Sequence, residues 1–307
     1  MSLISRNLLF IFCLFLFAAC STTSKPLTMD MSLENGTSFN YVITTTSDMG
    51  MSIMGQDMST TGQYFQDYNF IVKDVKPTGV TDVDFKITKM TIDQSVPMVG
   101  DMSYDSSKKE DDSNSPFAGL GGMIGKTMQA SFDRRGNVTS IEGADVIMKE
   151  VLGKVKGGEQ VSQLLDNYLG EESYKNIFAT LTGYSQGKPL NIGDTWSRKV
   201  ASKSGVTLST EYNYTIRERK DGRVTIDVTG TSKSDPDADP IETNGMKISS
   251  SLAGPITGVV VVDEKTGWAI SSDIQQDLEG EMTIGGTPMG DMNLDAKLKI
   301  GVAARRK

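Results

Sequence analysis

Apolar and polar positions alternate along much of the chain, and this alternation predicts antiparallel strands that bury one face. The clearest case is residues 292–302, where every second residue is apolar and Asn, Asp and Lys occupy most positions between them. Such an uninterrupted segment is long for a strand. In residues 83–92 the apolar phase shifts between Ile87 and Met90, which predicts a β-bulge there.

The same order of short motifs occurs twice in the sequence. The first copy contains Gly-Thr-Ser-Phe at 36–39, Tyr-Asn-Phe at 68–70 and a turn at 132–136; the second contains Gly-Asp-Thr-Trp at 193–196, Tyr-Asn-Tyr at 212–214 and a turn at 262–268. A repeated order of strand and turn signals indicates an internal duplication. We therefore predict a duplicated antiparallel β-sheet unit that forms a curved sheet or half-barrel.

Between the two copies the spacing of apolar residues changes to three and four, which is typical of amphipathic helices. Residues 144–183 therefore predict two or three short helices, with Gly170 and Gly183 as C-terminal stops and Ser173 as an N-cap. We expect this short helical connector to pack on the sheet. The predicted fold class is α+β, mainly β.

These patterns divide the chain into six predicted parts. They are a lipoprotein signal peptide at 1–19, a lipidated cysteine and flexible tether at 20–34, the first β repeat at 35–143, the helical connector at 144–183, the second β repeat at 184–303 and a basic tail at 304–307.

The amino terminus has the form of a secretory signal. Arg6 precedes an unbroken apolar run at 8–19, which is too short to span a bilayer as an anchor. The run ends in Ala-Ala-Cys at 18–20, which resembles the lipobox of bacterial lipoproteins, although Phe17 stands where Leu is usual. The resemblance implies lipidation of Cys20 and attachment to a membrane. The alternative is an ordinary signal peptide with an incidental cysteine.

Composition restricts the chemistry that the protein can perform. The chain has 307 residues, 31 Lys and Arg, 39 Asp and Glu, no His, and two Cys within its first twenty residues. The net charge of −8 argues against a nucleic-acid-binding surface. The absence of His removes the most frequent general base and metal ligand. We therefore expect no catalytic residues, no metal site and no cofactor, and a protein that is not an enzyme.

Methionine is unusually frequent, with 17 residues that include groups at 49–58, 97–102 and 288–292. Flexible, apolar Met side chains suit irregular cores and adaptable binding surfaces. Thioethers are also soft ligands for Cu(I). Lining of a core or cavity is the favoured interpretation, and methionine-based Cu(I) binding remains an alternative.

Several segments together resemble a family of bacterial envelope lipoproteins that carry a domain of unknown function. They are the lipobox, Met-Gly-Gln at 54–56, Gly-Asn-Val at 136–138, the Pro-x-x-x-Gly-Asp-Thr-Trp segment at 189–196 and the turn at 263–267. The resemblance covers nearly all of residues 35–303. It implies a location in the cell envelope, at the outer membrane facing the periplasm because Ser21 follows the cysteine, and a β-rich body without an assigned activity.

Two functions are compatible with this sequence. The first is a binding module that holds an apolar, lipid-like ligand against a curved sheet. The second is a structural or assembly lipoprotein that docks on an envelope protein partner. A Met-, Phe- and Leu-lined cavity without charges favours the first function, whereas a filled core and an exposed apolar patch favour the second. The ligand-binding residues are unknown from the sequence.

Overall fold

The computed structural model describes residues 27–53, 56–97, 100–108, 117, 119–153, 169–202, 207–243, 246–286 and 290–307. The predicted signal peptide, Cys20 and residues 21–26 of the predicted tether lie outside the described residues, and so do residues 154–168 of the predicted helical connector. Residues 27–34 of that tether instead pack against the body of the protein, because Leu27, Met29, Met31 and Leu33 are buried. Residues 304–306 of the predicted basic tail belong to the last strand of the sheet.

Thirteen strands and three short helices make up the described structure. The strands are β1 Ser38–Ile53, β2 Gln56–Val75, β3 Thr81–Val96, β4 Gly100–Asp105, β5 Met128–Phe132, β6 Val138–Glu142, β7 Thr195–Ser202, β8 Leu208–Lys220, β9 Arg223–Ser234, β10 Ile241–Thr243, β11 Met246–Asp263, β12 Ala269–Gly285 and β13 Met292–Arg306. The helices are the 3₁₀ helix η1 Leu120–Met123 and the α-helices α1 Ala144–Leu152 and α3 Glu171–Ala179.

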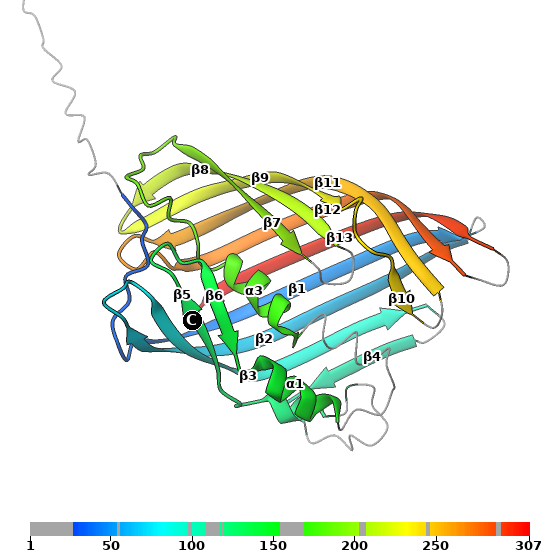
Figure 1. The fold of residues 1–307 in the computed structure, drawn as a ribbon, viewed down its shortest axis with the longest axis horizontal. Helices are drawn as coiled ribbons and strands as arrows, with labels where there is room; N and C mark the ends of the chain where they lie inside the picture. Colours follow the sequence, from blue (N-terminus) through cyan, green and yellow to red (C-terminus); the bar gives the residue numbers. More distant parts are fainter. Residues whose placement is uncertain are drawn as a thin grey trace, which may run out of the picture.

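All these strands belong to one sheet with the order β6-β5-β3-β2-β1-β13-β12-β11-β9-β8-β7, while β4 pairs with β3 and β10 pairs with β11. The sheet is curved, and the helices lie on its concave side (Figure 1). The described strands β6 and β7 end the order and do not pair with each other. The predicted mainly-β α+β fold is thus confirmed.

The strand pairing shows the duplication directly. Phe39 pairs with Phe70 between β1 and β2, and Trp196 pairs with Tyr214 between β7 and β8. A register shift begins two residues after Phe70, at 72–74 in β2, and two residues after Tyr214, at 216–218 in β8. Strands β1, β2, β3, β5 and β6 of the first copy therefore correspond to β7, β8, β9, β11 and β12 of the second. Strand β13 is an addition that joins the copies by pairing with β1 and β12.

Two local predictions about strands are confirmed. The pairing of β2 with β3 skips Thr88, which places a bulge between Ile87 and Met90. In β13, exposure alternates from Asn293 to Lys299 as the sequence pattern requires.

The helical connector has different boundaries from those predicted. Helix α3 begins at Glu171 with Gly170 as its N-cap residue, so Ser173 lies within the first turn and is not the cap. Gly170 has an extended conformation (φ −75°, ψ 170°), whereas Gly183 lies beyond the helix with φ +83°. Glycine is favoured at such a left-handed position because it has no Cβ. Leu169 is helical and Gly170 is not, so Gly170 ends one helical segment, as predicted, and also precedes α3, whereas Gly183 marks a turn beyond that helix.

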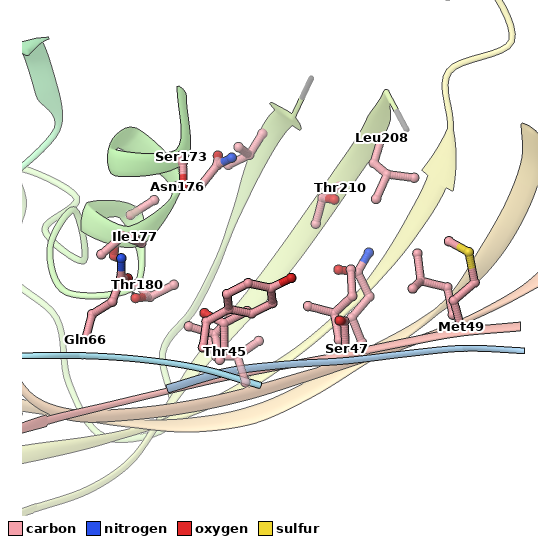
Figure 2. Close-up of a pocket in the computed structure, with 18 of the residues that line it drawn as sticks. Thr45, Ser47, Met49, Gln66, Ser173, Asn176, Ile177, Thr180, Leu208 and Thr210 are labelled. Atoms are coloured by element: carbon pink, nitrogen blue, oxygen red, sulfur yellow. Dashed lines mark hydrogen bonds between the residues drawn. The ribbon is translucent and has the colours of Figure 1, made fainter. Parts of the chain in front are cut away.

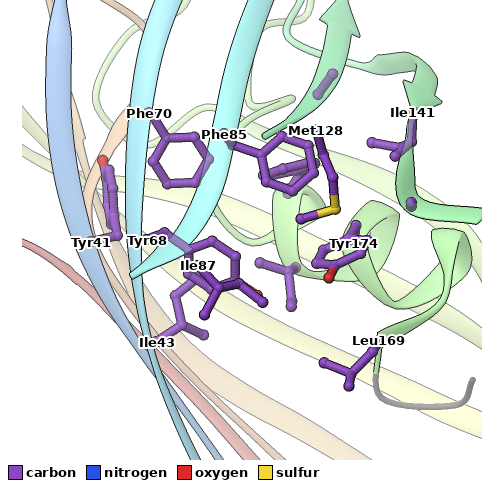
Figure 3. Packing of buried hydrophobic residues seen from close by; sticks show 14 of the residues in the cluster. Tyr41, Ile43, Tyr68, Phe70, Phe85, Ile87, Met128, Ile141, Leu169 and Tyr174 are labelled. Atoms are coloured by element: carbon purple, nitrogen blue, oxygen red, sulfur yellow. The ribbon is translucent and has the colours of Figure 1, made fainter. Parts of the chain in front are cut away.

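Helix α3 packs on the sheet through an aromatic cluster. The ring of Phe178 lies 5.0 Å from that of Phe85, 5.6 Å from Phe132 and 5.8 Å from Phe70, measured between centroids. Trp268 closes the same cluster from the second copy, 5.8 Å from Phe70. Figure 3 shows this packing around Tyr41, Phe70, Phe85 and Tyr174. The connector thus covers the sheet, as expected, and fills one end of its concave face.

Within the part of the chain that the structure describes, no helix has the length and apolar character needed to cross a membrane.

Candidate functional site

A cavity of about 520 Å³ lies on the concave face of the sheet, beside the aromatic cluster. Its lining comes from β1, β2, β3, β7, β8, β11, β12 and β13 and from α3, so both copies contribute. Figure 2 shows α3 and β8 facing the central strands across this space. The apolar lining residues include Met49, Met90, Ile92, Phe117, Leu169, Ile177, Val200, Leu208, Ile248, Ile274, Met282, Leu298, Ile300 and Val302.

The cavity exists because inward side chains become small along the central strands. In β1 the inward residues Phe39, Tyr41 and Ile43 are buried in the core. The next inward residues of β1 are Thr45, Ser47 and Met49, which line the cavity. The small hydroxyl side chains of Thr45 and Ser47 do not fill the space above the strand, whereas aromatic rings fill it at the other end of β1.

One row of cross-strand partners crosses the floor of the cavity from wall to wall. In order, its members are Gln94, Gly62, Ser47, Ile300, Gln276, Ile256, Gly230, Tyr212 and Arg198. Adjacent partners in a row lie on the same face of a sheet. The row therefore links residues from β3 to β7 that no sequence motif connects.

Glycines on the concave face permit close approach of strands in the second copy. A Cβ added at Gly230 would lie 2.2 Å from the carbonyl oxygen of Glu211, and one added at Gly254 would lie 1.8 Å from that of Asp277. Both contacts involve the backbone of a neighbouring strand, which cannot move aside cheaply. The curvature of the cavity wall thus depends on these glycines.

Helix α3 and the turn after it border the cavity on the side opposite the floor. Ser173, Asn176, Ile177 and Thr180 line the space from this helix (Figure 2). The Thr180 hydroxyl donates to the Ile177 carbonyl at 2.7 Å, and the Tyr184 hydroxyl donates to the Thr180 carbonyl at 2.8 Å. These bonds hold the end of α3 in position over the cavity.

The polar lining contains two buried amides with unsatisfied atoms. The Nε2 atom of Gln276 and the Oε1 atom of Gln94 have no hydrogen-bond partner among the described residues. By contrast, the Oε1 atom of Gln66 accepts a bond from the Tyr68 hydroxyl at 3.1 Å. An unsatisfied buried polar atom is costly, and protein atoms cover both of these atoms.

Arg198 is the one charged residue in the cavity lining that the structure describes. It is half-buried on β7, and its guanidinium lies against the turn after α3, where a Cβ added at Gly183 would be 2.6 Å from Nη1. Burial raises the pKa values of the neighbouring Tyr212 and Tyr214, an effect that the Arg198 charge partly opposes. These hydroxyls are therefore neutral near pH 7, and the cavity is an apolar space with one cation.

The sequence predicted the general character of this lining but not its members. Met49, Met90 and Met282 face the cavity, as expected for methionines that line a binding space. Met54, Met98 and Met289, from the three Met groups, lie outside the described residues. Arg198 departs from the expectation of a lining without charges. Its position could have been found from the alternation of Trp196, Arg198 and Val200, which gives these residues one face of the strand.

A family model described as "Family of unknown function (DUF6263)" matches residues 78–269, which is more than half of the chain. The match spans β3 to β11 and the helices between them. No curated protein matches the sequence.

Among solved structures, the chain is similar to a lipovitellin described in a study of lipid–protein interactions, with 10% identity and a TM-score of 0.48 over 90% of this chain. The chain spans 25% of that protein's length. It is also similar to an outer-membrane channel from Pseudomonas putida F1, with 8% identity and a TM-score of 0.19 over 90% of this chain and 97% of the channel. A lipoprotein-sorting protein domain from Vibrio parahaemolyticus gives 8% identity and a TM-score of 0.13 over 87% of this chain and 85% of the domain.

Proposed function

The chain belongs to the DUF6263 family of unknown function, and from its cavity we propose that it is a non-catalytic binding protein that holds one apolar, acyl-chain-like ligand. The observation that carries the proposal is the unfilled space of about 520 Å³ between the sheet and α3. Ligand sites in proteins typically have volumes of about 300–1,000 Å³ and predominantly apolar walls.

The lining suits a flexible chain better than a rigid polar ligand. Met49, Met90 and Met282 can adapt to its shape, and Thr45 and Ser47 leave a shallow floor along β1. Each buried CH₂ contributes about 0.8 kcal/mol, so about ten methylenes would contribute about 8 kcal/mol before the cost of ordering the ligand. A single medium-length chain therefore gains enough by burial to bind.

We place this activity in the bacterial cell envelope, with the protein anchored through a lipid on Cys20. The support is the signal-like segment at 1–19 and the lipobox-like Ala-Ala-Cys at 18–20. A basic test is the mass of the N-terminal peptide of protein purified from bacterial membranes. Diacylglycerol on Cys20 would support the anchor, and an unmodified chain released by cleavage at another bond would refute it.

Docking on an envelope protein is the alternative to ligand binding. In the described part of the chain, the exposed large apolar side chains are Ile71, Val75, Val146 and Ile192, on β2, α1 and the segment before β7. They give this alternative less support than the cavity gives to ligand binding.

Binding of an uncharged chain tests the proposal without involving Arg198. All described contacts lie within residues 27–307, so a chain beginning at Ser21 keeps every one of them. We expect 1-dodecanol to displace a fluorescent acyl probe from this protein with one site per chain. Absence of saturable binding would contradict the proposal. Displacement of the probe by Cu(I) alone would instead favour the methionine-based metal site.

A further inference from the structure

We propose that the ligand of this cavity is an anionic single-chain amphiphile and that Arg198 binds its acid group. This inference rests on the proposed function and specifies the chemistry of the ligand. It assigns the apolar chain to the floor formed by β1, β12 and β13, and the head group to the wall formed by β7 and β8.

The position of Arg198 in β7 directs it to the concave face. It stands opposite Tyr212 in β8, between the inward residues Trp196 and Val200. The next residue, Lys199, is on the other face, where its Nζ lies 3.5 Å from a carboxylate oxygen of Glu211. Two adjacent cations of the same strand are thus in different surroundings: one is paired at the surface, and the other lines an apolar cavity.

No carboxylate of the described residues lies within ion-pair distance of the Arg198 guanidinium. Its electrostatic neighbours are the hydroxyls of Tyr184, Tyr212 and Tyr214. Burial raises the pKa values of all three, so these groups are uncharged near neutral pH and do not compensate the cation. A partly desolvated charge without a counter-ion is unfavourable. An anionic ligand would supply the missing counter-ion.

Charge complementarity identifies the class of head group. A guanidinium presents planar, forked N–H donors that match a carboxylate or a phosphate and are poorly matched to an alcohol. The protein as a whole carries a net charge of −8. Because the overall charge repels anions, selectivity for an acid must come from this local cation. Gln276, in the same cross-strand row as Arg198, also belongs to the cavity lining.

The test compares dodecanoate, dodecyl phosphate and 1-dodecanol on the protein from Ser21, on Arg198→Gln and Arg198→Lys, and on the matched control Lys199→Gln. In the unchanged protein and in Lys199→Gln, we expect at least one acid to bind about tenfold more tightly than the alcohol, as a charge-assisted hydrogen bond requires. In Arg198→Gln that ratio should fall to near one while dodecanol binding is kept. Arg198→Lys should retain part of the preference for the acid over the alcohol.

The outcomes separate this inference from the proposed function. Equal affinity of all three ligands for the unchanged protein, or an acid preference that survives in Arg198→Gln, would overturn the role of Arg198 and leave the cavity proposal standing. Failure of every ligand to bind would overturn both. If circular dichroism shows that Arg198→Gln is unfolded, the role of Arg198 is decided by comparing the unchanged protein with Arg198→Lys. The quantity compared is the ratio of the affinity for the acid to the affinity for the alcohol. The carboxylate and phosphate arms identify which acid group the site prefers.

Discussion

Arg198 occupies in the second copy the position that Tyr41 occupies in the first. Arg198 lies two residues after Trp196 and pairs with Tyr212 of the neighbouring strand. Tyr41 lies two residues after Phe39 and pairs with Tyr68 of the neighbouring strand. Tyr41 is fully buried, and its hydroxyl donates to the carbonyl of Ala269. The two copies have thus diverged at one equivalent site: one fills the core, and the other places a cation in the cavity lining.

Filling the cavity should block binding. Thr45→Phe adds a ring at the centre of the floor, where an inward residue now leaves space. We expect at least about tenfold weaker dodecanol binding, because the ring displaces buried methylenes of the ligand. Probe displacement measures the effect.

Thr46→Phe is the matched control, since Thr46 is the next residue of β1 and is exposed on the other face. It should bind dodecanol like the unchanged protein. Equal binding by Thr45→Phe and Thr46→Phe would show that the ligand does not occupy this floor.

The buried tyrosines should make the protein sensitive to alkali. Burial raises the pKa values of Tyr41, Tyr68 and Tyr174 above the ordinary value near 10. Above about pH 10 the unfolded chain therefore loses protons that the folded chain retains, and stability falls with rising pH by about 1.4 kcal/mol per pH unit for each such tyrosine. Below pH 10 this contribution is fully present. Urea unfolding between pH 8 and 11 measures the slope.

Tyr174→Phe and Tyr41→Phe separate charge from hydrogen bonding. The Tyr174 hydroxyl has no partner among the described residues, so Tyr174→Phe should keep or slightly raise stability at pH 8 and make the alkaline decline shallower. Tyr41→Phe loses the bond to Ala269 and should cost about 1 kcal/mol at pH 8. An unchanged alkaline slope in both variants would contradict the assignment.

The curvature of the second copy should depend on Gly230. Gly230→Ala places a Cβ 2.2 Å from a backbone oxygen of β8, and we expect a loss of about 2 kcal/mol or more in the free energy of unfolding. At Gly50 in β1, an added Cβ would have nothing within 4 Å, so Gly50→Ala should change stability by less than about 0.5 kcal/mol. Urea unfolding of the two variants gives the comparison, and equal stabilities would refute the close strand approach.

The sequence predicted the strands, the bulge between Ile87 and Met90 and the duplication because each depends on local periodicity or on repeated order. It did not predict where β13 pairs, since alternation fixes which face of a strand is buried but not its neighbours. It also did not predict the cavity. Thr45 and Ser47 look like ordinary positions of a strand, and only the packing of α3 shows that they border a cavity among the described residues. Arg198 was missed because a charged residue next to Lys199 suggests a solvated surface.

Native mass spectrometry of the protein from Ser21, purified from a bacterial periplasm and then extracted with solvent, tests directly whether the cavity holds a lipid chain. We expect discrete adducts of a few hundred daltons that extract as single-chain lipid acids, with the adducts lost in Thr45→Phe and retained in Thr46→Phe. A bare protein mass that stays bare after addition of dodecanoate and dodecanol would contradict the claim that this cavity holds a lipid chain.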